Sequence, residues 1–323
     1  MATPTQAQAS RHQQRQALIA AAGAAAVRRL LEQKAPWPDV AATFASYQFA
    51  AVLAAIRTMA GWASSTPLTD PSVFAGVSSA GFPAVEPLIA TIDRFEPAPP
   101  EALPDAWWDE ARAFMQATEQ LIASEIADAA RTASQVEMVG QGWTNYIRML
   151  QTPSCDRCTI LAGRIYRDLD AFDRHPGCDC VMIPVDDAEA ARARGLISDP
   201  EEAFEKGLVG GYRTAEDGSK TFVPSLSKAD RRAIADGADP ATVVNARRAG
   251  IRAPAGITNA QTVDLFGRRV KATNLGTTKR AQWRKQNPTR LVRLRPESIY
   301  QFAVDRDDAL RLLRLYGYLP PAA

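Results

Sequence analysis

The sequence predicts an α+β protein with three parts: a mainly helical N-terminal region, residues 1–150, a small Cys/His-cornered α+β module, residues 151–186, and a mixed C-terminal region, residues 187–323. Three observations predict this order. Long Ala- and Leu-rich stretches with helical spacing of apolar residues fill the first part. Four cysteines then gather in one short segment, and short β-type runs alternate with short helical runs beyond it. With 323 residues, 46% hydrophobic and 23% charged, the chain is long enough for about two domains with buried cores.

Two long helices are predicted near the N-terminus. Residues 8–32 are rich in Ala, Leu, Arg and Gln and contain no Pro, which favours a helix. Its first turns are polar on all sides, so we expect them to fray in solvent and to leave His12 in a polar tail. The second helix begins at Trp37 and runs to about Trp62, with apolar residues recurring on one side at helical spacing.

Nothing in the N-terminal part predicts a membrane partner. Residues 2–16 are Gln-rich and lack the continuous apolar stretch of a secretory signal. The run from Ala17 to Val27 is mostly Ala and is too short and too weakly apolar to span a bilayer. We therefore expect a soluble protein that is made in the cytoplasm.

The next segment, residues 64–104, carries many of the prolines and predicts an extended connection with short helices at most. Asp105 is a suitable cap for a further long helix that continues to about Val136. Residues 143–150 form a last short helical or extended piece. We thus expect the N-terminal region to end just before the first cysteine.

Short elements are predicted in the rest of the chain. In the cysteine segment, residues 159–166 and 181–185 resemble strands. The C-terminal region predicts a helix at 187–194, a hairpin at 209–223, helices at 227–236 and 240–249, two strands at 262–273 and one or two helices at 296–317.

The cysteine segment offers five soft metal ligands in 26 residues. The pattern is C-x2-C followed by H-x2-C-x-C, with ligands Cys155, Cys158, His175, Cys178 and Cys180. Two such turns can bring four ligands to one tetrahedral ion, and a sulfur-rich set favours zinc. Either four Cys, or three Cys plus His175, would close the site, so the zinc would be structural.

Two other interpretations of this segment remain open. The cysteines can instead pair as disulfides or stay free thiols, and a protein that is located outside the cell favours the disulfides. Alternatively, His175 is the base of a protease with a Cys or Ser nucleophile, because the only other histidine is His12 in the polar tail. No Gly-x-Ser-x-Gly or His-Glu-x-x-His motif supports the enzymatic interpretation.

The segment resembles the Mu F-type minor head proteins of tailed bacteriophages, in particular the actinobacteriophage branch of that family. The resemblance rests on the order C-x2-C, Leu-Ala-Gly, an aromatic residue, His-Pro-x-Cys-x-Cys and a following Pro. These are Cys155, Cys158, Leu161, Gly163, Tyr166, His175, Pro176, Cys178, Cys180 and Pro184. The motif covers about a tenth of the chain.

The resemblance implies a virion protein that is present in few copies in the capsid interior or at the portal vertex. Such proteins associate with the portal, other head proteins and packaged DNA, and they act in head morphogenesis. Members of this branch are often labelled capsid maturation proteases. The chain is therefore expected to be a minor capsid protein, with a maturation protease as the alternative.

A basic run from Arg268 to Arg295 suggests DNA contact. No Asp or Glu interrupts it, although the net charge of the whole chain is only +2. Such a run could neutralise several phosphates in a salt-sensitive, sequence-independent way, whereas the alternative is a solvated face or a surface for an acidic partner. A virion protein that binds DNA independently of sequence is therefore a further alternative for the function. The candidate DNA-binding residues are Arg268, Arg269, Lys271, Lys279, Arg280, Arg284 and Lys285.

Overall fold

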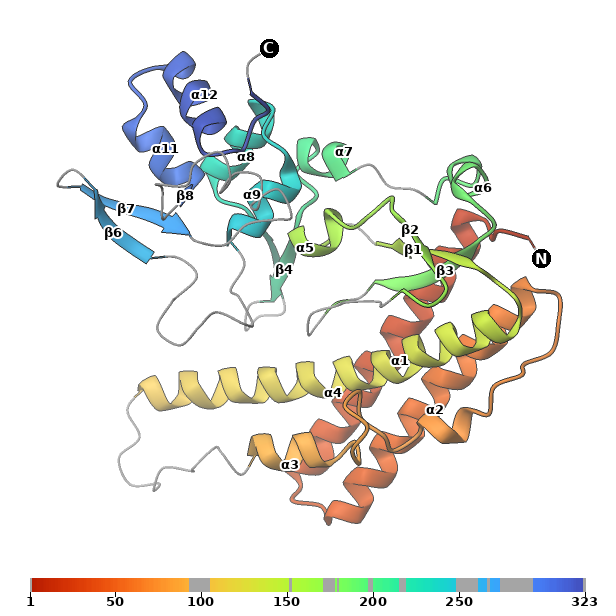
Figure 1. Ribbon diagram of the computed structural model, residues 1–323. Coiled ribbons are helices and arrows are strands. Elements are labelled where there is room, and N and C mark those ends of the chain that lie inside the picture. Colours follow the sequence, from red (N-terminus) through yellow and green to blue (C-terminus); the bar gives the residue numbers. More distant parts are fainter. Residues whose placement is uncertain are drawn as a thin grey trace. The chain divides into compact units, whose positions relative to one another are not determined.

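The computed structural model confirms the α+β class (Figure 1). It describes residues 2–92, 105–150, 153–170, 178, 180–196, 200–214, 219–247, 261–265, 268–273 and 293–321. The chain folds into two compact units: Met1–Gln151 with Gly163–Ser198, and Thr152–Ala162 with Asp199–Ala323. Residues of the predicted Cys/His module therefore contribute to both units.

Three long helices build the first unit: α1 (Gln6–Glu32), α2 (Trp37–Trp62) and α4 (Asp105–Gly140). They pack against one another, as Figure 1 shows for the red, orange and yellow-green ribbons. Their shared core is apolar and includes Val27, Phe44, Ile122 and Ile126. The helical spacing that predicted α2 thus corresponds to its buried side.

The start of α1 differs from the prediction, because its polar first turns are ordered and partly buried. Thr5 caps the helix and forms a capping box with Gln8. His12, Gln13 and Gln16 are buried, and the Gln16 side chain donates a hydrogen bond to the carbonyl of Ala51, 3.1 Å away. Polar residues here face another helix rather than solvent, so the expectation of a frayed tail is wrong.

The Pro-rich connection contains only short helices, as predicted, namely η1 (Pro71–Phe74) and α3 (Glu86–Ile92). Two buried carboxylates of α4 hold it. Glu137 accepts hydrogen bonds from the backbone N–H groups of Leu68 and Thr69, and Glu125 accepts from the backbone N–H and hydroxyl of Ser79. Residues 93–104 of the predicted connection lie outside the described residues.

By length and composition, α2 is the one helix in the described part of the chain that could cross a membrane. Of the 18-residue apolar stretch of α2 that is long enough to cross a membrane, 44% is buried inside the protein. A core helix of a soluble protein passes the same test, so this finding is weak evidence for a membrane span.

A three-stranded antiparallel sheet completes the first unit. Its order is β2-β1-β3, with β1 (Asn145–Met149) in the middle, β2 (Ile165–Arg167) on one edge and β3 (Val181–Val185) on the other. Residues 143–150 are therefore mainly a strand. In the predicted strand 159–166 only the end is extended, because Cys155 instead caps a helical turn, α5 (Asp156–Thr159). The short helix α6 (Ala188–Ala193) follows the sheet and is capped by Asp187.

The second unit is built from short elements, most of which the sequence predicted. The hairpin, the helices expected at 227–236 and 240–249, the strand pair and the final two helices all form; the helix α7 and the strand β8 were not expected. Beside α5 the elements are α7 (Pro200–Glu205), β4 (Gly210–Thr214), β5 (Lys220–Pro224), α8 (Lys228–Ala235), α9 (Pro240–Arg247), β6 (Gln261–Leu265), β7 (Arg268–Thr273), β8 (Arg293–Leu294), α11 (Pro296–Phe302) and α12 (Arg306–Leu315).

A buried charged network stabilises this unit beside its apolar core. Ser227 caps α8, and the fully buried Asp230 completes a capping box by accepting from the backbone N–H and hydroxyl of Ser227. Arg247 pairs with Asp230 and also with Glu297, 3.2 Å away. Glu297 in turn pairs with Arg295 at 3.1 Å. Burial raises the pKa of Asp230, and the nearby Arg247 charge opposes that rise.

Candidate metal centre and its surroundings

The first two candidate ligands lie on one helical turn. Cys155 is the N-cap residue of α5, and its Sγ accepts a hydrogen bond from the backbone N–H of Cys158, 3.3 Å away. The hydroxyl of Thr159 donates to the Cys155 carbonyl at 2.9 Å, which fixes the turn. A backbone N–H pointing at sulfur favours the thiolate over the thiol, and the thiolate is the form that binds metal.

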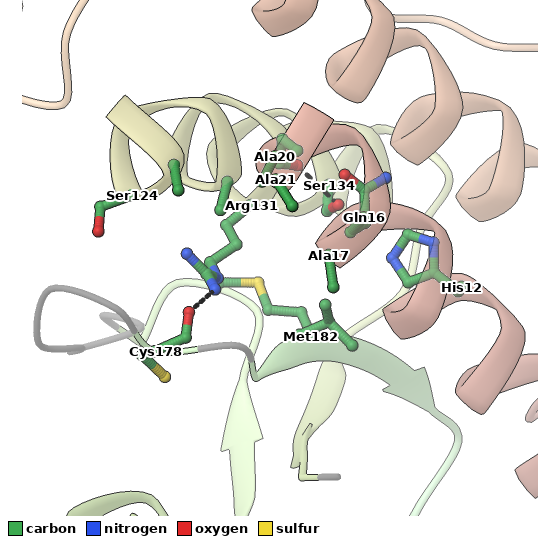
Figure 2. A pocket seen from close by; sticks show the side chains of 14 residues that line it. His12, Gln16, Ala17, Ala20, Ala21, Ser124, Arg131, Ser134, Cys178 and Met182 are labelled. Carbon is green, nitrogen blue, oxygen red and sulfur yellow. Dashed lines mark hydrogen bonds between the residues drawn. The ribbon is translucent and has the colours of Figure 1, made fainter. Parts of the chain in front are cut away.

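The other two cysteines stand at the entry to β3, and Arg131 of α4 holds their backbone. Its Nε donates to the carbonyl of Cys180 at 2.8 Å, and its Nη2 donates to the carbonyl of Cys178. Figure 2 shows this guanidinium directed at the Cys178 carbonyl. Asp128, one turn earlier on α4, accepts from Nη1 of Arg131 at 3.0 Å and balances its charge. The arrangement fixes where the chain presents both sulfurs.

A second buried arginine contacts a cysteine sulfur directly. Arg148 lies on β1, which pairs with β3 in the register Arg148↔Met182. Its Nη1 donates to the Sγ of Cys180 at 3.1 Å, and the two residues are 3% and 0% exposed. A buried guanidinium beside sulfur stabilises a negative charge on it, so this contact favours a thiolate at Cys180.

Three of the predicted ligands, Cys158, Cys178 and Cys180, are buried cysteines that could hold a metal ion. Cys178 and Cys180 belong to the first unit, and Cys158 belongs to the second. Cys178 and Cys180 are also at disulfide distance, with Cα atoms 5.7 Å apart. Cys155 is half-buried, and His175 lies outside the described residues.

The chemistry of these donors fits zinc. Thiolates are ligands that zinc prefers, and the buried positive charges of Arg131 and Arg148 lie beside two of the cysteines. A disulfide between Cys178 and Cys180 would remove two of the ligands, because a metal requires deprotonated thiols. A bound metal and this disulfide would therefore exclude each other at the same two side chains.

The sequence predictions missed the two arginines that surround the cysteines. The sequence did contain an indication for Arg148, because this charged residue interrupts the run of Tyr146, Ile147 and Met149. The structure shows that these three neighbours are buried. A charged residue inside a buried strand needs a specific partner. Arg131 carried no such signal, because its partners are backbone carbonyls distant in the sequence.

His12 is not the solvent-exposed residue that the sequence predicted. It is 4% exposed and packs edge-on against Trp62, with ring centroids 5.5 Å apart. Burial, helped by the positive charge of Arg15, lowers the pKa of His12 to about 4. His12 is therefore neutral at neutral pH. The protease hypothesis placed its base at His175, which lies outside the described residues.

The candidate DNA-binding residues lie largely outside what the structure describes. Arg268, Arg269 and Lys271 belong to β7, whose backbone alone is described, and Lys279, Arg280, Arg284 and Lys285 fall in the undescribed stretch 274–292. The last two cations of the basic run are buried. Arg293 stacks on the Tyr318 ring, 5.1 Å from its centroid, and Arg295 pairs with Glu297. These two arginines therefore stabilise the second unit and do not face phosphates.

Comparison with known proteins adds no relative: no family model, no curated protein and no solved structure matches the chain.

Proposed function

We propose that the chain is a minor head protein of a tailed bacteriophage, of the Mu F type, whose cysteine module is a structural zinc site. The protein is made in the host cytoplasm and enters the virion, in the capsid interior or at the portal vertex. Its partners are the portal, other head proteins and packaged DNA, with no role for a membrane. The motif from Cys155 to Pro184 is the basis of this proposal.

The observation that carries the structural role is the burial of the thiols. Cys158, Cys178 and Cys180 are 2%, 8% and 0% exposed. A nucleophilic cysteine has to reach a substrate and is usually partly exposed, whereas structural ligands are enclosed. Burial thus supports a structural role of these three thiols rather than a protease that uses one of them as its nucleophile.

The proposed zinc has four protein ligands and no open position. Cys158, Cys178 and Cys180 supply three thiolates, and Cys155 or His175 supplies the fourth ligand. Such a closed tetrahedral set leaves no site for water, so the ion would add folding stability rather than reactivity. The contacts of Arg131 and Arg148 would hold the Cys178–Cys180 end of the set in place.

Metal analysis tests the zinc proposal directly. Protein purified without chelator under reducing conditions should contain about one zinc per chain. Cys180→Ser should abolish the bound zinc, and a comparison of Cys155→Ser with His175→Gln should identify the fourth ligand, because only one of them should lose the metal. A folded, metal-free protein in which mass spectrometry finds the cysteines in disulfides would reject the proposal.

Virion composition tests the assignment as a head protein. The chain should be found in purified particles of its phage at a few copies per particle, and it should co-purify with the portal protein of the same genome when the two are expressed together. Particles that lack the chain would contradict the assignment. Cleavage of the major capsid protein on co-expression, lost in His175→Gln, would instead favour the maturation protease.

A further inference from the structure

The first unit contains a cavity that the proposed function does not use. Its volume is about 170 Å³, and it lies between α1, α4 and the entry to β3 (Figure 2). The cavity exists because the facing residues of α1 and α4 are alanines, whose side chains are single methyl groups and do not fill the space between the helices. They are Ala17, Ala20, Ala21, Ala123, Ala127 and Ala130.

The cavity has an exposed rim and a buried floor. Ala17 and Ala21 of α1 are exposed, whereas Val181 and Met182 of β3 are 4% and 2% exposed. Figure 2 shows Met182 below the cavity, with Arg131 opposite His12. A small molecule could therefore enter past the alanines and rest on apolar side chains.

Two polar atoms of the cavity wall have no hydrogen-bond partner among the described residues. They are Nδ1 of His12 and Oε1 of Gln16, and both atoms are buried. The two side chains are 4% and 5% exposed, and the Gln16 amide nitrogen is already bonded to the Ala51 carbonyl. A buried polar atom without a partner is unfavourable, so a ligand that supplies a donor gains a hydrogen bond at this site.

Water alone is a poor occupant of this space. A buried water makes about three hydrogen bonds, and the volume would hold several waters. Most of them would face alanine, valine and methionine surfaces that offer no partner. A cavity with an apolar lining and a few placed polar atoms is typical of small-molecule sites.

The charges around the cavity favour a neutral occupant. His12 is neutral at neutral pH, because burial lowers its pKa to about 4. The guanidinium of Arg131 is engaged by Asp128 and by the carbonyls of Cys178 and Cys180. Neither an anion nor a cation would find an unmatched charge at this wall.

We propose that this cavity binds a small neutral molecule with an apolar body and a hydroxyl group, which donates to Oε1 of Gln16 or Nδ1 of His12. A single aromatic ring fits the space, since apolar cavities of about 150 Å³ accommodate benzene. Phenol combines such a ring with one donor and is a suitable probe. Cys178 also lines the cavity, but the proposed hydrogen bonds to His12 and Gln16 need neither its sulfur nor a metal.

Titration calorimetry of the full-length protein with phenol tests this proposal. Wild type should bind phenol at one saturable site, and benzene, which lacks the hydroxyl, should bind about tenfold more weakly because one hydrogen bond is lost. Ala17→Leu should weaken phenol binding at least about tenfold, since the larger side chain fills the rim. Leucine favours helix almost as well as alanine, so α1 should stay intact.

Ala22→Leu is the matched control, because Ala22 is exposed on the same helix and lies outside the cavity lining. Its phenol affinity should equal that of wild type, and circular dichroism should show both variants folded. The proposal is overturned if wild type shows no saturable phenol binding, if benzene binds as tightly as phenol, or if the two leucine variants lose affinity equally.

Discussion

Arg148 donates a hydrogen bond from Nη1 to the Sγ of Cys180 across 3.1 Å, and both residues are buried. The guanidinium is positively charged at any accessible pH, whereas a thiol is a weak acceptor. The contact is therefore much more favourable if the sulfur carries negative charge. It links the central strand β1 to the proposed ligand set and gives Arg148 a testable role as a positioning residue.

Replacing Arg148 by methionine should weaken zinc binding about 10- to 100-fold, the usual effect of removing a partner of a metal ligand. The cause is loss of both the hydrogen bond and the compensating charge at Cys180. Competition against a chromophoric zinc chelator measures the affinity. Arg167→Met is the matched control, because it removes the same charge from the exposed residue of the neighbouring strand β2. Equal zinc affinities for the two variants would show that Arg148 has no role in positioning the zinc ligand Cys180.

The long helices and most short elements could be predicted because local patterns determine them. The apolar spacing of α2, the caps Ser227 and Asp305, and the Pro content of residues 64–104 each act within a few residues of the chain. The α+β class follows from these features. Burial of the polar first turns of α1 could not be predicted in this way, because it depends on partners such as Ala51 on another helix.

The cysteines could be identified from their spacing, but their surroundings could not. Residues 152–162 belong to the second unit, where Ser154 forms a parallel bridge with Val209. That pairing joins segments more than fifty residues apart, and no spacing rule encodes it. The contacts of Arg131 likewise depend on α4 passing beside β3, which is a tertiary property.

Acidification should destabilise the first unit through His12. Its pKa is about 4 in the folded chain against an ordinary 6.5, so the unfolded chain binds the proton more tightly. The free energy of unfolding is therefore not reduced by His12 above pH 6.5. It falls as the pH decreases from 6.5 toward 4, by about 3 kcal/mol in all. His12→Phe keeps a ring against Trp62 and cannot titrate. Urea unfolding at several pH values should give a flatter pH dependence between 6.5 and 4 for this variant; parallel curves would contradict the buried, neutral His12.

Glu137→Gln should destabilise the protein by about 2 kcal/mol at neutral pH, because the neutral amide offers one acceptor oxygen in place of two to the N–H groups of Leu68, Thr69 and Gln141. Burial raises the pKa of Glu137, but the hydrogen bonds from Gln141, Thr69 and Leu68 together outweigh it and leave the pKa below the ordinary 4.5. A lowered pKa gives stability that is present above 4.5 and lost as the pH falls through the folded value. The difference from wild type should therefore shrink in acid.

Glu119→Gln is the control for this measurement. Glu119 lies on the same helix, its side chain is 37% exposed, and it pairs loosely with Arg28 at 3.7 Å. Such surface pairs contribute about 0–1 kcal/mol, so urea unfolding should find little change. A Glu137→Gln variant as stable as Glu119→Gln would show that the Pro-rich connection does not depend on the carboxylate.

Arg247→Met should destabilise the second unit by about 3 kcal/mol. The change leaves Asp230, which is fully buried, without its cationic partner, and breaking a buried pair from one side is costly. Arg311→Met is the comparison, since Arg311 is 64% exposed and pairs with Asp308 at the surface. Urea unfolding should show a large shift for the first variant and almost none for the second; similar shifts would mean that the network adds no stability.

Two glycine substitutions should change stability in opposite directions. A Cβ at Gly23 of α1 would lie 2.5 Å from Cδ1 of Ile126 and 2.9 Å from Cβ of Tyr47, whereas a Cβ at Gly61 of α2 would meet nothing within 4 Å. Alanine favours helix over glycine by about 1 kcal/mol, so Gly61→Ala should stabilise the protein by up to that amount. At Gly23 the same gain is outweighed by overpacking, which costs about 1–3 kcal/mol.

Urea unfolding should therefore place Gly23→Ala below wild type and Gly61→Ala above it. The double variant Gly23→Ala, Ile126→Val removes the methyl group in closest contact and should recover part of the loss, even though Ile→Val alone costs about 1 kcal/mol in a core. Such recovery identifies the contact of α1 with α4 as the source of the strain. If Gly23→Ala instead stabilises the protein as much as Gly61→Ala, α1 does not approach α2 and α4 as closely as the structure places it.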